Sequence, residues 1–506
     1  MGMGGVQSLR YVLMLLLCLA VTLISRSGGF LRDITASSFD LDLLVVAAIV
    51  SAPREAHNQT KEPSFRHGGD MSTGILSERS ADFFRDLQET VDQDDNVSRC
   101  LRYRFTPPSE SDQPKKRRIF YGSLIADESW ELFEIVAAET NGIFEAMVFV
   151  ESNRTQNFSH RRFKRLNHTH SLQALFGTER VQIRSFVNED PSLNGLSREH
   201  KQRAEIIKGW KDLGMTQDDV GLLADADETF TRDFLRAIQV CNDIPLLNYE
   251  KHRCRHGSVK LKGKTLVFES SPECIAKQRT WFHPDMIIGY CIEGIGNETM
   301  HPKAPRIFES YHRAKGFGSG CDAKGWANET AIADDRYPLY DASDFRRTCA
   351  GHFAILNPEE PQSKYGRYTG FHFHNFFADA NAIRFKYRTF GHGVKDAYFK
   401  PLGEMSNDLR VMYNCARNIT DDQTQKWKRL PGGFNELLLP LPIYFQDAIY
   451  REKRHQFIET IVTADEKERI AKAKSNKSSR KRRHQFLQTI VKADEKERNA
   501  KVRSNK

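Results

Sequence analysis

The feature that most constrains the fold is a short apolar run that ends in a cluster of acids. Residues 220–224 read Val-Gly-Leu-Leu-Ala, and Asp225-Ala226-Asp227-Glu228 follow directly. An unbroken apolar run of this length is typical of a buried strand in a mainly parallel sheet. Open α/β sheets bind their ligands at the carboxyl ends of such strands, so Asp225 and Asp227 are predicted to lie at a ligand-binding edge.

Two carboxylates at a strand end also indicate a kind of ligand. Their oxygens are hard donors that suit Mg²⁺ or Mn²⁺, and such an ion can bridge the two phosphates of a nucleotide-sugar. We therefore predict a divalent metal held by Asp227, with Asp225 beside it. The alternative interpretation is an acidic turn that caps a helix beginning near Thr229.

The segments around this motif alternate between strand and helix patterns. Short apolar runs predict strands, whereas apolar residues at helical spacing predict the helices between them. This alternation predicts an α/β fold with a mostly parallel, doubly wound sheet. The predicted strands span 118–123, 146–150 and the run before Asp225, with shorter ones at 265–269 and 286–290, and the helices span 129–140, 198–213 and 231–241.

The N-terminal region has a different composition. Residues 9–25 are the most hydrophobic window, with an uncharged stretch over 11–24 that is shorter than the ~20 residues of a comfortable span. No small-x-small cleavage site follows. We predict an uncleaved signal anchor in residues 1–30, with a cleaved signal peptide as the alternative, and a weakly structured stem over 31–116.

Sequons and cysteines indicate an oxidising, lumenal environment. Nine Asn-x-Ser/Thr sequons occur, at Asn58, Asn96, Asn153, Asn157, Asn167, Asn297, Asn328, Asn418 and Asn476. Apart from Cys18, eight dispersed cysteines remain without a Cys-x-x-Cys pair, which favours disulfides over a zinc site. Together these features predict a single-pass type II membrane protein of the secretory pathway.

The C-terminal residues 451–506 contain a repeat. The sequence RHQFIETIVTADEKERIAKAKSNK (454–477) recurs as RHQFLQTIVKADEKERNAKVRSNK (483–506). This tail carries 18 Lys/Arg and 8 Asp/Glu, so the chain's net charge of +9 belongs to it. We expect a mostly solvated helical tail; amphipathic helices for a partner or an anionic surface are the alternative. Lumenal topology argues against nucleic acid as a partner.

Three motifs in order resemble one known family. IFYGSLIADESWELFEIVAAETNGIFEAMVFVESNRT (119–155), DDVGLLADADETF (218–230) with Arg232-Asp233, and GFHFHNFF (370–377) resemble the β-1,4-mannosyl-glycoprotein 4-β-N-acetylglucosaminyltransferase family, glycosyltransferase family 17. The resemblance implies a GT-A-like nucleotide-sugar-binding fold over 117–450. It also implies a Golgi enzyme that transfers N-acetylglucosamine, with inversion, from a UDP donor to a mannose of an N-glycan.

This sequence departs from the family pattern at three places. Thr229-Phe230 replace an Ile-Pro, Phe371 replaces a Trp, and QNFSHRRFKRL (156–166) replaces a Gly-x-x-Lys-Pro-type segment. These differences leave open another donor or acceptor on the same fold. From a different class, an inactive glycan-binding or scaffolding protein is the second alternative.

The resemblance and the residue chemistry together assign candidate roles. The metal ligands are Asp225, Asp227 and His372, and the nucleotide-sugar contacts are Asp225, Glu151, Arg232 and His372. Inversion requires a general base, for which Glu228, Glu273, Asp285 and Glu293 are candidates, with Asp227 and Glu228 as the catalytic pair. The alternative role of Glu228 is helix capping. His374 lies on the same strand face as His372. Arg203 is a second candidate for a diphosphate contact, and the alternative role of both Arg203 and Arg232 is a surface salt bridge.

Overall fold

The computed structural model describes most of one compact unit, residues 67–506. The described residues are 78–109, 116–192, 195–244, 260–281, 283–292, 294–296, 352–354, 368–390, 400–419, 424–426 and 441–468, with single positions between them. Among these, no helix is both long and apolar enough to cross a bilayer. The predicted anchor over 1–30 lies outside the described residues.

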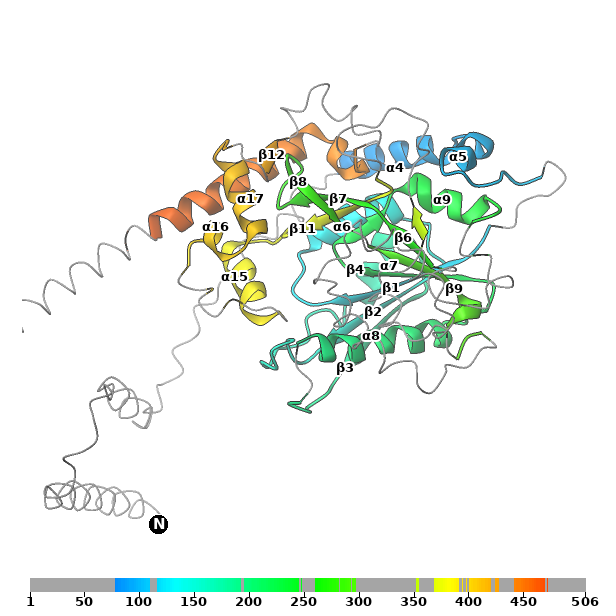
Figure 1. The fold of residues 1–506 in the computed structure, drawn as a ribbon, viewed down its shortest axis with the longest axis horizontal. Coiled ribbons are helices and arrows are strands. Elements are labelled where there is room, and N and C mark those ends of the chain that lie inside the picture. The colour runs from blue at the N-terminus through cyan, green and yellow to red at the C-terminus, as the bar shows by residue number, and fades with distance from the viewer. Residues whose placement is uncertain are drawn as a thin grey trace, which may run out of the picture. The chain divides into compact units, whose positions relative to one another are not determined.

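The first sheet has the strand order β10-β6-β9-β4-β1-β2-β3 (Figure 1). Its centre is parallel, because β1 pairs in parallel with both β2 and β4, and β2 pairs in parallel with β3. Beyond β4, strand β9 is antiparallel to both of its neighbours. The prediction of an α/β fold is confirmed. The bounds are β1 Ile119–Ile125, β2 Ala146–Ser152, β3 Val181–Phe186, β4 Val220–Asp225, β6 Lys260–Gly263, β9 Asp285–Ile288 and β10 His352–Ala354.

Helices cover both faces of this sheet. Figure 1 shows α8 (Gly195–Asp212) along one side and α6 (Trp130–Thr140) and α9 (Arg232–Val240) on the other. The helix α7 (Thr169–Phe176) lies between β2 and β3 in the chain. The predicted helices at 129–140, 198–213 and 231–241 are therefore confirmed to within a few residues.

Glycines let α8 approach the sheet closely. A Cβ on Gly122 of β1 would lie 2.1 Å from Cγ2 of Ile206, and one on Gly221 of β4 would lie 2.6 Å from the Trp210 ring. The Trp210 side chain is fully buried, and its Nε1 donates a hydrogen bond to the backbone oxygen of Tyr121 at 2.8 Å. The missing side chains in β1 and β4 thus make room for one indole ring.

A second sheet lies beside the first, with the order β12-β8-β7-β11-β5. Strand β11 pairs in parallel with β7 and antiparallel with β5, so segments far apart in the sequence meet there. The predicted strand at 265–269 is confirmed as β7. The bounds are β5 Glu228–Phe230, β7 Thr265–Glu269, β8 Cys274–Trp281, β11 Gly370–His374 and β12 Thr424–Lys426.

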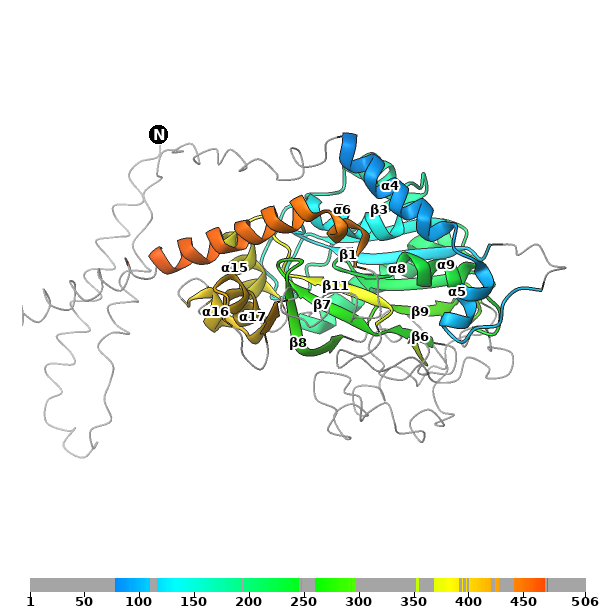
Figure 2. The same cartoon turned by 90° about the horizontal axis from the view of Figure 1, so that it is seen from above.

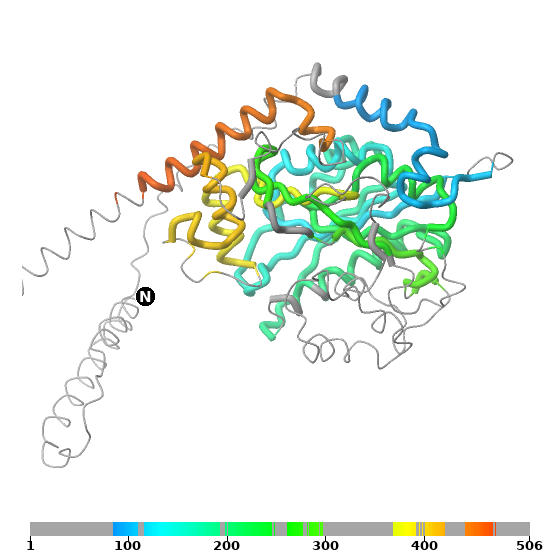
Figure 3. Tube along the Cα trace, turned by 45° about the horizontal axis from the view of Figure 1, so that its top comes forward, coloured from blue at the N-terminus to red at the C-terminus, as the bar shows by residue number. Residues whose placement is uncertain are grey.

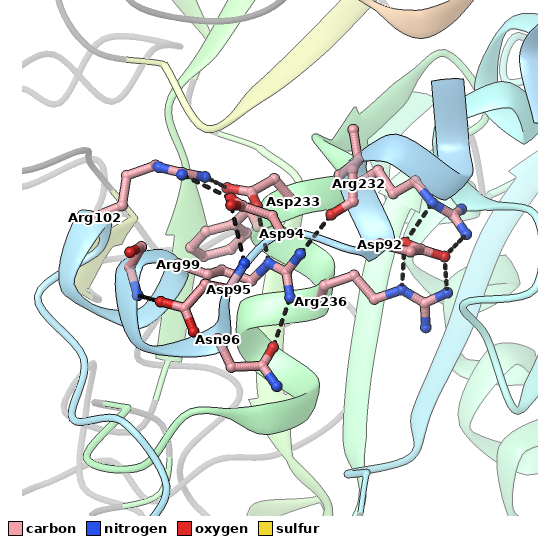
Figure 4. Close-up of polar contacts among 12 residues, drawn as sticks. Asp92, Asp94, Asp95, Asn96, Arg99, Arg102, Arg232, Asp233 and Arg236 are labelled. Carbon is pink, nitrogen blue, oxygen red and sulfur yellow. Dashed lines mark hydrogen bonds and ion pairs between the residues drawn. The ribbon is translucent and has the colours of Figure 1, made fainter. Parts of the chain in front are cut away.

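Residues 78–109 are folded, which corrects the expectation of a weakly structured stem as far as residue 116. They form α4 (Glu78–Asp92) and α5 (Asn96–Arg102), which pack beside α9 in Figure 2. The disulfide Cys100–Cys241 joins α5 to the end of α9. Figure 4 shows the polar contacts of this junction, where Asp233 accepts hydrogen bonds from Arg99 and Arg102. The hydroxyl of Tyr103 also donates to Asp233, at 2.7 Å.

The C-terminal part of the fold has its own apolar core. It contains α15 (Ala380–Thr389), α16 (Leu402–Met405), α17 (Asn407–Ala416) and a helix over 448–468. The disulfide Cys274–Cys415 fastens α17 to β8. The two described disulfides agree with the prediction of an oxidised protein.

The helix over 448–468 contains most of the first repeat copy and is not solvated. It runs beside α15, α16 and α17 in both Figures 2 and 3. Ile458 and Val462 are fully buried in the C-terminal core. The expectation of a solvated tail from residue 451 is therefore wrong for this segment, because its apolar stripe is needed to cover those helices. The second copy lies outside the described residues.

Candidate functional site

The acidic motif lies where the chain passes from the first sheet to the second. β4 ends at Asp225, Ala226 and Asp227 form a turn, and β5 begins at Glu228. β11 pairs with β5 so that His372 lies opposite Glu228. The backbone N–H of Phe373 also donates to the backbone oxygen of Asp227 at 2.7 Å. The turn is thus held against β11.

Asp227 and His372 form the centre of the site. His372 Nε2 lies 3.5 Å from Asp227 Oδ2, and the two side chains are 9% and 17% exposed. Burial raises the pKa of Asp227, but the nearby His372 ring, its hydrogen bond and the Lys386 ammonium outweigh burial and lower this pKa to about 2. Asp227 is therefore ionised at neutral pH, and its negative charge can attract a cation.

Glu228 shapes the turn from inside. Its side chain is fully buried; Oε2 accepts the backbone N–H of Asp225 at 2.9 Å, and Oε1 accepts the indole N–H of Trp281. The helix-capping interpretation of Glu228 is wrong, since Glu228 starts a strand and Thr231 caps α9 by accepting the N–H of Phe234. Glu228 thus closes the turn that carries Asp227, since it joins the backbone of Asp225 to Trp281 of β8.

Asp225 has a different partner. Its Oδ1 lies 2.6 Å from Nη2 of Arg203 on α8, and its side chain is 37% exposed. Arg203, which is 3% exposed, also pairs with Glu199 at 2.8 Å. Asp225 is therefore neutralised by a cation from the chain itself and does not join the group around His372.

Asp227, Glu228 and His372 form a group suited to a divalent cation. One ligand atom from each lies within 4.8 Å of the others. His372 is stacked on Trp281 with ring centroids 5.2 Å apart, and its Nδ1 is buried with no hydrogen-bond partner. The other ring nitrogen, Nε2, faces Asp227 and is the atom that an ion held by both residues would contact. The donors fit a metal such as Mn²⁺, which accepts carboxylate and imidazole ligands.

Comparison with known proteins identifies the segment that carries the motif. Residues 106–252 match the model of glycosyltransferase family 17. Over this segment the chain is similar to glycosyltransferase family 17. The predicted resemblance is confirmed there, and the matched segment includes Asp225, Asp227 and Glu228. No curated protein matches the chain.

The histidine half of the site lies beyond the family 17 segment. β11 brings His374 beside Glu269, its partner in the parallel register with β7. His374 Nδ1 lies 2.9 Å from Glu269 Oε1 and 4.0 Å from Asp408 Oδ2. These three residues form a second group with cation-binding geometry. His372 and His374 have ring centroids 5.0 Å apart but lie in separate groups, so the strand face that they share does not bring them to one ion.

Two residues of the family 17 segment that were predicted to contact the nucleotide-sugar, Glu151 and Arg232, instead contact other parts of the chain. Glu151 is fully buried and accepts the backbone N–H groups of Lys164 and Arg165 at 2.6 and 2.9 Å, which orders the loop after β2. Arg232 donates to both oxygens of Asp92 at 2.8 and 2.7 Å (Figure 4). The structure therefore gives Glu151 and Arg232 positioning roles within the fold; for Arg232 this is the salt-bridge alternative.

The general-base candidates are also buried. Asp285 is fully buried between Lys262, at 3.1 Å, and His283. Glu273 is 2% exposed beside His455. Glu293 lies outside the described residues. Neither described carboxylate belongs to the group around His372.

Four residues of the site were missed by the sequence analysis. Lys386 of α15 contributes positive charge near Asp227, and Trp281 of β8 supports His372 and Glu228. Glu269 and Asp408 complete the second group. Of these four residues, only Glu269 had a signal in the sequence, namely its position at the end of a predicted strand. The other three come from segments whose placement depends on the tertiary fold.

Proposed function

We propose that this chain is a metal-assisted, inverting glycosyltransferase that moves N-acetylglucosamine from UDP-N-acetylglucosamine to a β-linked mannose of an N-glycan. The family 17 segment supports the reaction class. The observation that carries the metal site is the convergence of Asp227 and His372 on the turn between the two sheets. We further propose that the fold is GT-A-like and that the catalytic region lies on the lumenal side of the Golgi membrane.

Asp227 and His372 would hold the divalent ion, and Glu228 would keep Asp227 in place. When bound, the metal neutralises charge on the diphosphate as the bond to the sugar breaks. Lys386 is half-buried and its ammonium lowers the pKa of Asp227, so it supplies a second positive charge on this side of the turn. The mixture of carboxylate, imidazole and ammonium groups suits a ligand that carries both phosphate and metal.

The acceptor hydroxyl must lose a proton to a general base. Glu228 and Asp285 are fully buried and already hydrogen-bonded or ion-paired. Asp408 and His374 are 18% and 14% exposed beside the first group. We therefore place the proton acceptor among the partly exposed residues of the second group in preference to the buried acids.

The test is stabilisation of the folded protein by ligand. UDP with Mn²⁺ should raise the melting temperature of the wild-type chain, because a ligand that binds only the native state stabilises it. Asp227→Asn should lose this shift, whereas Asp212→Asn, a change of an exposed acid on α8, should keep it. A panel of UDP-sugars with and without an N-glycan acceptor then assigns the donor. No shift with any sugar nucleotide would favour the inactive glycan-binding alternative.

A further inference from the structure

The first repeat copy is fixed to the fold at its N-terminal end by a buried arginine. The Arg454 side chain is 1% exposed. It donates to the backbone oxygen of Ser270 at 2.7 Å, to Glu131 Oε2 at 2.8 Å and to the backbone oxygen of Phe377 at 3.2 Å. Three acceptors from three separate segments leave little freedom in where this end of the helix can lie.

The middle of the copy closes an apolar surface. Ile458, Ile461 and Val462 are 0%, 7% and 0% exposed. They belong to one core with residues of α15, α16 and α17, among them Ile383, Leu402, Leu409 and Met412. We call the part of α15–α17 that receives them the docking surface. Without a helix over it, this surface would expose several large apolar side chains.

Two acids fix the C-terminal end of the described helix. Asp465 accepts hydrogen bonds from Arg384 and from the backbone N–H of Leu402, the latter at 3.1 Å. Glu466 accepts from the hydroxyl of Tyr413 and from Arg417. The docking surface therefore receives an apolar stripe followed by two adjacent acids, and the acceptors of Arg454 beside it add an arginine at a fixed spacing.

The second copy repeats that pattern. Arg483, Ile490, Val491, Asp494 and Glu495 are identical to their counterparts in the first copy, and Leu487 replaces Ile458. The other differences before Glu466 fall at Glu459 and Thr463, which are only partly buried. Every side chain that fixes the first copy on the docking surface thus has an equivalent 29 residues later.

We propose that the docking surface accepts either copy, so that residues 483–506 are a second, interchangeable docking helix of the same chain. The first copy occupies the surface because it continues directly from the segment fixed by Tyr450, whose hydroxyl donates to Glu131 at 2.8 Å. Seating the second copy requires residues 454–482 to form a loop, and the entropic cost of a loop grows slowly with its length. The second copy therefore takes over when the first is disabled.

Paired substitutions in the full chain test this exchange. Ile458→Asp with Ile461→Asp disables the first copy, and Leu487→Asp with Ile490→Asp disables the second in the same way. We expect the second pair alone to leave the melting temperature unchanged. Added to the first pair, it should lower the melting temperature by about 5 °C or more, since no intact copy then remains to cover the apolar surface. Equal melting temperatures for the first pair and the fourfold variant would overturn the proposal.

Two deletions provide an independent test. Removing 454–482 joins Lys453 to Arg483 and puts the second copy in the register of the first, so this variant should melt within a few degrees of the wild type. Removing 454–506 leaves no copy and should lower the melting temperature by about 5 °C or more, as in the fourfold variant. The proposal fails if the two deletions behave alike. Light scattering should show monomers; a dimer of the 454–482 deletion would place the second copy on another molecule and overturn seating in the same chain.

Discussion

His372 Nε2 lies 3.5 Å from Oδ2 of Asp227, although the two residues come from different sheet-forming segments of the chain. The contact exists because β11 pairs with β5 immediately after the acidic turn. This contact explains why Asp227, and not Asp225, lies in the group with cation-binding geometry. Asp225 is instead paired with Arg203 of α8.

Asp227→Asn and His372→Ala are each expected to lower kcat/KM by about 100-fold or more, the usual effect of removing one electrostatic stabiliser of a transition state. The measurement is initial-rate kinetics with UDP-N-acetylglucosamine and an N-glycan acceptor in Mn²⁺. Asp212→Asn is the matched control, and its melting temperature and rate should equal those of the wild type. Full activity of Asp227→Asn would remove the metal role from this turn.

Lys386→Met is expected to weaken UDP binding without lowering the melting temperature, because Lys386 supplies charge near Asp227 and is half-buried.

Arg232→Met is expected to lower the stability of the fold without weakening UDP binding. Loss of its pair with Asp92, in which only Arg232 is buried, should lower the free energy of unfolding by about 1–2 kcal/mol, with UDP affinity retained. Calorimetric titration with UDP and thermal melts separate the two effects. Weakened UDP binding by Arg232→Met would instead restore its predicted diphosphate role.

Glu139 is expected to make stability depend on pH. It is buried on α6, where burial raises its pKa to about 7 although it accepts the backbone N–H groups of Ile443 and Arg232. A raised folded-state pKa contributes stability that is fully present below the unfolded value of 4.5 and is lost as the pH rises through 7. The loss amounts to about 3 kcal/mol.

Urea unfolding at pH 5 and pH 8 measures this effect. The stability of the wild type relative to Glu139→Gln should fall between the two values, since glutamine does not titrate. Glu89→Gln, an exposed position on α4, is the control and should show no such change. A difference between wild type and Glu139→Gln that stays constant with pH would contradict the raised pKa.

Gly221→Ala is expected to destabilise the fold by about 1–3 kcal/mol, the usual range for overpacking a core. The added Cβ would lie 2.6 Å from the Trp210 ring, which is held by its hydrogen bond to Tyr121. Chemical denaturation measures the change. Trp210→Phe removes the atoms involved, so the double variant should lose less than the sum of the single ones. Additive losses would show that the ring and the glycine do not meet.

The glycosylation sites provide a test of lumenal exposure. Asn167 and Asn418 are exposed and should carry glycans when the protein is made in a secretory host. Asn153 is partly buried and its Nδ2 donates to Glu189 at 2.7 Å, so it should remain unmodified. Peptide mass spectrometry after enzymatic deglycosylation gives the occupancy of each site. Unmodified Asn167 and Asn418 would contradict the predicted lumenal location.

The sequence alone determined the elements whose signals are local. The apolar runs that became β1, β2, β4 and β7 depend on consecutive residues, as do the helices α6, α8 and α9. The acidic turn was located in the same way, because an apolar run and its terminal acids are adjacent in the chain. These features form wherever hydrophobic periodicity and capping residues agree.

Only the tertiary structure decided which charged groups meet. Arg232 and Glu151 have the residue types of ligand contacts, but Asp92 from α4 and the backbone of 164–165 occupy them. The first repeat copy has the pattern of a surface helix, yet α15–α17 bury its stripe. The physical reason is the same for Arg232, Glu151 and the repeat copy. The partner of a charged group or an apolar face is set by long-range packing, and the local sequence does not encode it.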